Sequence, residues 1–184
     1  MSSLPDALPQ PVLTARRLSR YLSRMLDSQP WLGSVLAESV DAPIGEADMQ
    51  RFLATRELVF GGGDGALRPA LRQLRMWTLC HLIVRDLELG APLAEVTETM
   101  TVLAEVAVRH AHDVLRASLV ERYGQPLSPT GWEQELLVIG MGKLGGRELN
   151  VSSDIDLIFI YPEDGDTGGR KTISNYEFFE KLGK

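Results

Sequence analysis

Two aspartates separated by a single residue are the clearest candidates for chemistry in this sequence. Asp154 and Asp156 follow a pair of serines and lead into the apolar residues 157–159. Side chains alternate along a strand, so both carboxylates would project from the same face. Two carboxylates side by side repel each other, and a hard cation such as Mg2+ that both can bind offsets that cost. The pair therefore predicts a metal site.

A glycine cluster precedes the aspartates and directly follows the apolar run 136–139. Glycine has no side chain, so its backbone can approach a phosphate group closely. Phosphate bound together with Mg2+ is therefore the working hypothesis. Lys143 and Arg147 could equally lie on the surface, and the two serines could instead shape the turn. The candidate phosphate-binding and nucleotide-binding residues are Gly142, Lys143, Gly145, Gly146, Arg147, Ser152 and Ser153.

Two familiar phosphate motifs resemble this stretch without fitting it. Residues 140–145 match the G-x-G-x-x-G pattern of dinucleotide-binding proteins, but a Rossmann unit needs a crossover helix of ten or more residues before its next strand. Only residues 146–153 separate the last glycine from Asp154. A P-loop would need serine or threonine after Lys143, where the sequence has Leu144. A dinucleotide-binding oxidoreductase remains as an alternative, and it requires a crossover helix after Gly145.

Composition limits the function classes. The net charge of −6 and the pI of about 5.1 argue against a nucleic-acid-binding protein. The N-terminus lacks the features of a signal peptide, and no apolar run is long enough to span a membrane, so we expect a cytoplasmic protein without membrane contact. Cys80 is expected to be buried, and His81, His110 and His112 are expected to have structural or surface roles.

The residues before the glycine cluster show helical periodicity, and those after 131 favour strands. A loose leader is predicted at 1–12, a helical region at 13–123, a linker at 124–131 and a strand-containing region at 132–184, which makes the chain α+β. Helices are predicted from Thr14 to before Pro30, across 31–40, from Asp48 to Phe60, across 67–87, and from Pro92 to before Gly124. The glycine-rich segment 61–65 is predicted to connect two helices.

The spacing between glycine and aspartate identifies a family. Gly142 is followed by eleven residues and then by Asp154-Ile155-Asp156, a pattern that resembles the nucleotidyltransferase superfamily of DNA polymerase beta. The longer string 140–159, which reads GMGKLGGRELNVSSDIDLIF, is more specific. It resembles the family of bifunctional glutamine synthetase adenylyltransferase/adenylyl-removing enzymes.

This resemblance implies a fold and an activity. The family has two catalytic domains in a much longer chain, and this sequence resembles the N-terminal part, whose domain removes adenylyl groups. Residues 132–184 would then begin that domain. The implied reaction is Mg2+-dependent phosphorolysis of adenylyl-tyrosine on glutamine synthetase by orthophosphate, which releases ADP. The second domain would carry out the opposing ATP-dependent adenylylation, so the family regulates nitrogen assimilation.

One part of the expected site has no counterpart in the sequence. Sites of this superfamily use a third carboxylate on a later strand, and the acidic residues after Asp156 lie in segments typical of turns or helices. We therefore predict a truncated domain and little or no activity for the 184-residue chain alone. A docking module remains as a further alternative, in which the helical residues 14–122 would bind glutamine synthetase or a PII-type nitrogen-signalling protein.

Overall fold

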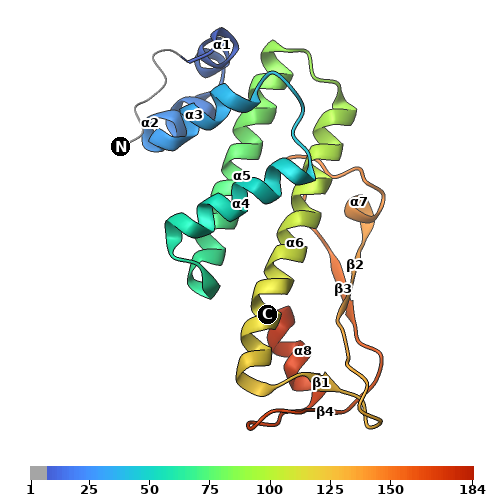
Figure 1. Cartoon of the computed structure of the whole chain (residues 1–184). Coiled ribbons are helices and arrows are strands. Elements are labelled where there is room, and N and C mark those ends of the chain that lie inside the picture. Colours follow the sequence, from blue (N-terminus) through green and yellow to red (C-terminus); the bar gives the residue numbers. More distant parts are fainter. Residues whose placement is uncertain (1–7) are drawn as a thin grey trace.

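Long helices dominate the chain, and a two-stranded hairpin lies beside the longest of them (Figure 1). The computed structural model describes residues 8–184. The elements are α1 (Gln10–Leu18), α2 (Arg20–Ser28), α3 (Pro30–Ser39), α4 (Glu46–Phe60), α5 (Gly63–Glu88), α6 (Leu93–Tyr123), β1 (Pro126–Leu127), β2 (Leu137–Gly140), α7 (Gly142–Gly145), β3 (Leu157–Ile160), β4 (Asp166–Thr167) and α8 (Asn175–Gly183). The predicted α+β class is confirmed. None of the helices described is both long and apolar enough to cross a membrane.

The N-terminal helices differ from the prediction in two respects. The helix expected from Thr14 to Pro30 is two helices, because Ser19 has an extended backbone and its side chain accepts a hydrogen bond from the Leu22 N–H. Such an N-cap satisfies a free donor of the second helix and so competes with helix continuation. In addition, α1 begins at Gln10, inside the expected leader, and Val12 is fully buried. The rest of that leader, residues 1–7, lies outside the described residues.

The predicted connection between α4 and α5 is confirmed but is shorter than the expected 61–65, because residues 63–65 already belong to α5. Gly61 ends α4 in the left-handed conformation, with φ of 88°, and α5 begins at Gly63. Helices α4, α5 and α6 pack against one another around a core in which Leu74 is fully buried. Phe52 and Trp77 stack there with ring centroids 4.7 Å apart.

The core contains buried polar and sulfur groups, and the predicted burial of Cys80 is confirmed. Cys80 is fully buried, and burial raises the pKa of its thiol to about 12. His81 is also fully buried, with Nδ1 3.5 Å from the Ser39 hydroxyl. On α6, His110 lies 2.7 Å from a carboxylate oxygen of Glu57.

Helix α6 belongs to two packing clusters. Its N-terminal half contributes Met100, Leu103 and Val106 to the helical core, and its C-terminal half packs against the buried aromatic residues of α8. The segment predicted as a linker, 124–131, contains β1, which pairs with β4 in an antiparallel two-stranded sheet. The chain therefore continues from α6 into ordered structure, and the proposed division into domains stays a prediction.

The hairpin of β2 and β3 determines how the glycines and aspartates meet. The strands are antiparallel, with Leu137 opposite Ile160 and Gly140 opposite Leu157. A Rossmann unit needs parallel strands joined by a long helix, whereas the only helix between these strands is the four-residue α7. The dinucleotide-binding alternative is therefore wrong.

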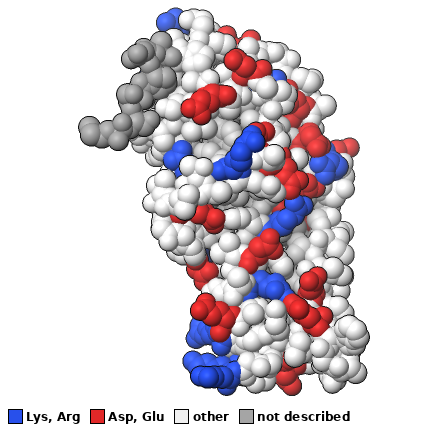
Figure 2. Space-filling model, viewed as in Figure 1, with Lys and Arg blue, Asp and Glu red and all other residues white. Residues whose placement is uncertain are grey.

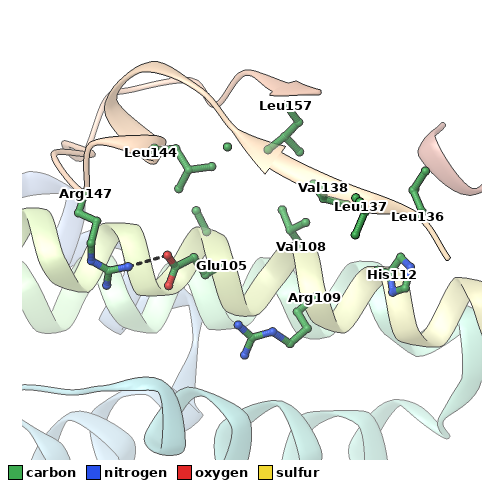
Figure 3. A pocket seen from close by; sticks show the side chains of 13 residues that line it. Glu105, Val108, Arg109, His112, Leu136, Leu137, Val138, Leu144, Arg147 and Leu157 are labelled. Atoms are coloured by element: carbon green, nitrogen blue, oxygen red, sulfur yellow. Dashed lines mark hydrogen bonds and ion pairs between the residues drawn. The ribbon is translucent and has the colours of Figure 1, made fainter. Parts of the chain in front are cut away.

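The apolar side chains of this hairpin are covered to different degrees. Val138 and Leu157 lie on the inner face, toward α6, and are partly buried (Figure 3). Phe159, opposite Val138, shares that face and is 45% exposed. The outer face carries the directly opposed pairs Leu137–Ile160 and Ile139–Ile158. These four side chains are between 42% and 56% exposed.

Candidate functional site

The hairpin brings the glycine cluster and the aspartates to the same end of the two strands. The Met141 N–H donates to the Asp156 carbonyl oxygen at 2.9 Å, so strand pairing continues one residue beyond β2 and β3. Both aspartates precede β3, which begins at Leu157. Met141, which belongs to the glycine turn of residues 140–146, thus lies directly across from Asp156.

The alternation of the hairpin assigns Asp156 to a face. Leu157 points inward, so Asp156, whose carbonyl pairs with Met141, belongs to the outer face of Ile158, and Asp154 lies two residues earlier, before the paired residues. Both aspartates are exposed. Within residues 8–184, neither carboxylate has a hydrogen bond or an ion-pair partner. Mg2+ is commonly bound by one or two carboxylates together with waters and phosphate oxygens. Two carboxylates that are not paired with a positively charged side chain therefore suit this ion. Among the described residues, no group of three or more His, Cys, Asp or Glu could hold a metal.

The glycines of the turn have two different roles. A Cβ on Gly145 would lie 2.6 Å from the Gly140 carbonyl oxygen, and a Cβ on Gly140 would lie 2.9 Å from the Leu144 side chain. These two glycines therefore allow α7 to pack against β2. Gly142, by contrast, has φ of 54° with open space around it. Of these three glycines, it is the one beside which the structure leaves room for a ligand.

The two cations of the segment are placed differently. Lys143 is exposed, and its ammonium group has no ion-pair or hydrogen-bond partner within residues 8–184. Arg147 points toward α6, where it forms ion pairs with Glu98 and Glu105 (Figure 3). Sequence reasoning missed these two glutamates. Their seven-residue spacing, two helical turns, was the available signal that they share a face.

The two serines bond within their own turn. Asn150 Oδ1 accepts hydrogen bonds from the Ser152 hydroxyl at 3.3 Å and from the Ser153 hydroxyl at 2.7 Å, and also from the Ser152 N–H. A side chain that accepts in this way forms an Asx turn, which fixes the backbone before the aspartates. The turn-shaping alternative is thus what the structure displays, and a phosphate contact by either hydroxyl stays a prediction.

A separate cleft lies behind the hairpin, between its inner face and α6 (Figure 3). It has a volume of about 480 Å³. Glu105, Arg109 and His112 of α6 line one wall, and Val138 and Leu157 of the hairpin line the other. Asp154 and Asp156 are not among its lining residues, and Asp156 belongs to the opposite face.

The surface shows no broad region of one charge on the face drawn in Figure 2, where basic and acidic side chains are interspersed. Many are paired across elements, as Arg109 of α6 is with Glu46 of α4.

The prediction for Asp166 was wrong. The acidic residues after Asp156 were expected in turns or helices, and Asp166 instead lies in strand β4. That strand pairs with β1 at the end of the molecule away from α7 (Figure 1), so it supplies no third carboxylate beside Asp154.

Comparison with known proteins gives one consistent result. A family model described as glutamate-ammonia ligase adenylyltransferase matches residues 11–184. The bifunctional glutamine synthetase adenylyltransferase/adenylyl-removing enzyme of Aromatoleum aromaticum is 63% identical over all 184 residues, which cover 19% of that protein. The enzyme of the same name from Chromobacterium violaceum is 50% identical over 167 residues, covering 90% of this chain and 18% of the relative. The chain thus spans about a fifth of the length of these relatives.

Proposed function

The chain belongs to the glutamate-ammonia ligase adenylyltransferase family, and on that basis we propose that residues 132–184 form part of a metal-dependent site for adenylyl removal. Its substrate would be the adenylyl-tyrosine of glutamine synthetase. Orthophosphate would attack the α-phosphorus, the bond from phosphorus to the tyrosine oxygen would break, and the phenolate would take up a proton. The products would be ADP and the unmodified tyrosine.

One observation supports this proposal most directly. Asp156 belongs to the outer face of a hairpin, next to the glycine turn, Asp154 precedes it by two residues, and neither carboxylate has a protein partner within residues 8–184. Two unpaired carboxylates two residues apart contribute no attraction to the fold and repel each other. Their placement is explained if they hold a divalent cation.

Each group of the site has a separate task in this proposal. Asp154 and Asp156 would hold Mg2+, which when bound neutralises the charge that develops on phosphate oxygens. The free ammonium group of Lys143 and the backbone N–H groups around Gly142 would bind the phosphates of the substrate. The Asx turn of Asn150 would keep the backbone of both aspartates in a fixed conformation.

Manganese binding to the 184-residue chain tests the metal site, with Mn2+ as a paramagnetic substitute for Mg2+. We expect a site that is lost in the double variant Asp154→Asn, Asp156→Asn. The chain supplies a matched control, because Asp164 and Asp166 form a second exposed Asp-x-Asp pair at the other end of the hairpin. Asparagine at those two positions should leave the binding unchanged. Equal Mn2+ affinity in wild type and in the Asp154, Asp156 variant would contradict the proposal.

The reaction itself needs a separate assay. ADP release from adenylylated glutamine synthetase, with orthophosphate as co-substrate, should be weak or absent with the 184-residue chain, because residues 8–184 form no group of three acidic or other metal-binding side chains around Asp154. Rapid release by this chain would show that the two aspartates suffice, and the prediction of an incomplete site would then be wrong.

A further inference from the structure

Arg147 has a backbone conformation that arginine rarely adopts. Its φ is 56°, and it is the only non-glycine residue with a positive φ within residues 8–184. The left-handed region brings Cβ close to the following carbonyl oxygen, so glycine is the residue that usually ends a helix in this way. Arg147 follows α7 and Gly146 at such a position. The local backbone alone would favour glycine here, so the arginine side chain has another role.

Three N–H groups of that side chain donate to two glutamates of α6. Its Nη2 and Nε donate to the two carboxylate oxygens of Glu98 at 2.6 and 3.3 Å, and its Nη1 donates to Glu105 at 2.7 Å. The bonds to Glu98 are bidentate, the geometry that guanidinium matches best. The hydrogen bond to Glu98 and the negative charges of Glu105 and Glu98 raise the pKa of Arg147. The three residues form the α6 ion-pair cluster.

The cluster is connected directly to the glycine turn. The Arg147 N–H donates to the Leu144 carbonyl at 3.2 Å, and the next N–H, of Glu148, donates to the Lys143 carbonyl at 2.8 Å. On either side of Arg147, Leu144 and Leu149 are 7% and 2% exposed and belong to the helical core. Two apolar side chains thus attach this segment to the helical core and one ion-pair cluster attaches it to α6, and Lys143 lies on the segment that they hold.

We propose that Arg147 is a positioning residue and not a phosphate ligand. Through Glu98 and Glu105 it holds the glycine turn against α6, and so fixes Lys143 and the N–H groups near Gly142 across from Asp156. This role rests on the proposed function, because it assigns phosphate binding to Lys143 and Gly142. A guanidinium whose donors face two carboxylates is directed away from the outer face, to which Asp156 belongs.

A variant that leaves Arg147 in place separates the two roles. In Glu98→Gln, Glu105→Gln the guanidinium is released from its carboxylates. If Arg147 were a phosphate ligand, ADP affinity measured by calorimetry with Mn2+ present would stay the same or rise. We expect it to fall at least fivefold, as in Arg147→Gly. Arg109→Ala, which removes a different surface ion pair of α6, should change it less than twofold. An ADP affinity that is retained or raised in the double glutamine variant would overturn the proposal.

Hydrogen exchange of the amides of residues 141–148 gives a readout that does not require ADP to bind. We expect at least tenfold faster exchange in Arg147→Gly and in the double glutamine variant, with the melting temperature nearly unchanged. Restoring the attraction with reversed charges, in Arg147→Glu, Glu98→Arg, Glu105→Arg, should slow the exchange again. If wild type fails to bind ADP, the proposed function fails, and exchange still decides whether Arg147 holds the turn. Unchanged exchange in Arg147→Gly would overturn the positioning role.

Discussion

The helical core and the outer face of the hairpin use the same kinds of residues in opposite ways. In the core, Leu22, Leu36 and Leu74 are fully buried among helices α1 to α6. On the outer face of the hairpin, Leu137 and Ile139 are 56% and 42% exposed. The helical core buries its apolar side chains. The outer face of the hairpin exposes them, and Asp156 belongs to the same face.

This difference separates stability from function in the chain. A hairpin of two strands is at best marginally stable alone, so this one depends on what its inner side contacts. Leu144 and Leu149, buried in the helical core, and Arg147, paired with α6, provide that attachment. The outer face buries less apolar surface, and the proposed function assigns ligand binding to it. Changes on the two sides of the hairpin should have different consequences, and the following predictions test this.

The largest expected effect is a cavity in the helical core. Leu74→Ala should lower the free energy of unfolding by about 2–5 kcal/mol, because the side chain is fully buried and neighbouring helices can only partly close the space. Leu137→Ala, the same change on the outer face, should cost less than about 1 kcal/mol, since much of that side chain already contacts water. Urea unfolding followed by circular dichroism measures both. Similar losses for the two variants would show that the outer face is covered in solution.

Acid should weaken the core through His81. Burial and, to a lesser extent, the charge of Arg85 lower the pKa of His81 from 6.5 to about 4. Between these pH values the unfolded chain takes up a proton that the folded chain does not. The contribution of neutral His81 to the free energy of unfolding is therefore complete above pH 6.5 and is lost progressively toward pH 4, by an amount on the order of 3 kcal/mol.

Unfolding free energies measured from pH 7 to pH 4 test this, with His81→Gln and His112→Gln compared. The His81 variant should lose part of the pH dependence, and the variant of the partly exposed His112 should keep it. Equal pH dependence in wild type and in His81→Gln would contradict the assignment.

The helical part of the fold could be predicted well from the sequence because its signals are local. Apolar spacing, the glycines at 61–62, and Gly90 with Pro92 mark where α4, α5 and α6 begin and end. The break at Ser19 was missed, since one hydroxyl that caps α2 outweighs an apolar spacing that continues through it. The pairing of β1 with β4 was missed for a different reason, as strands of two residues carry no periodicity.

The site could be predicted only in part. The aspartates and the glycine turn were identified from spacing, and the antiparallel hairpin brings them together. The sequence could not show which neighbouring residues each side chain contacts. The sequence leaves Arg147 open between a phosphate partner and a surface residue, and the structure pairs it with Glu98 and Glu105, which lie 49 and 42 residues away in sequence. Contacts over such separations depend on how the hairpin docks on α6, which no local pattern encodes.

The glycine turn offers an intermediate effect. Gly145→Ala places a Cβ 2.6 Å from the Gly140 carbonyl oxygen, so α7 must move away from β2, at a cost of about 1–3 kcal/mol. Gly142→Ala meets no neighbouring atom and costs only the left-handed backbone, about 1 kcal/mol. Thermal unfolding measures both costs. If the alanine at 142 proves the more damaging of the two, the close approach of α7 to β2 is not what makes glycine necessary at 145.

The smallest effect on stability should come from the residues proposed to matter most for chemistry. Asp154→Asn, Asp156→Asn removes two exposed carboxylates without protein partners in residues 8–184, and it relieves their mutual repulsion, so the free energy of unfolding should change by less than about 0.5 kcal/mol. Added Mg2+ should raise the melting temperature of wild type and not that of the variant, because a ligand that binds only the folded state stabilises it. A loss of 2 kcal/mol or more in metal-free buffer would mean that the aspartates support the fold itself, and the separation between an attached inner face and a ligand-binding outer face would not hold.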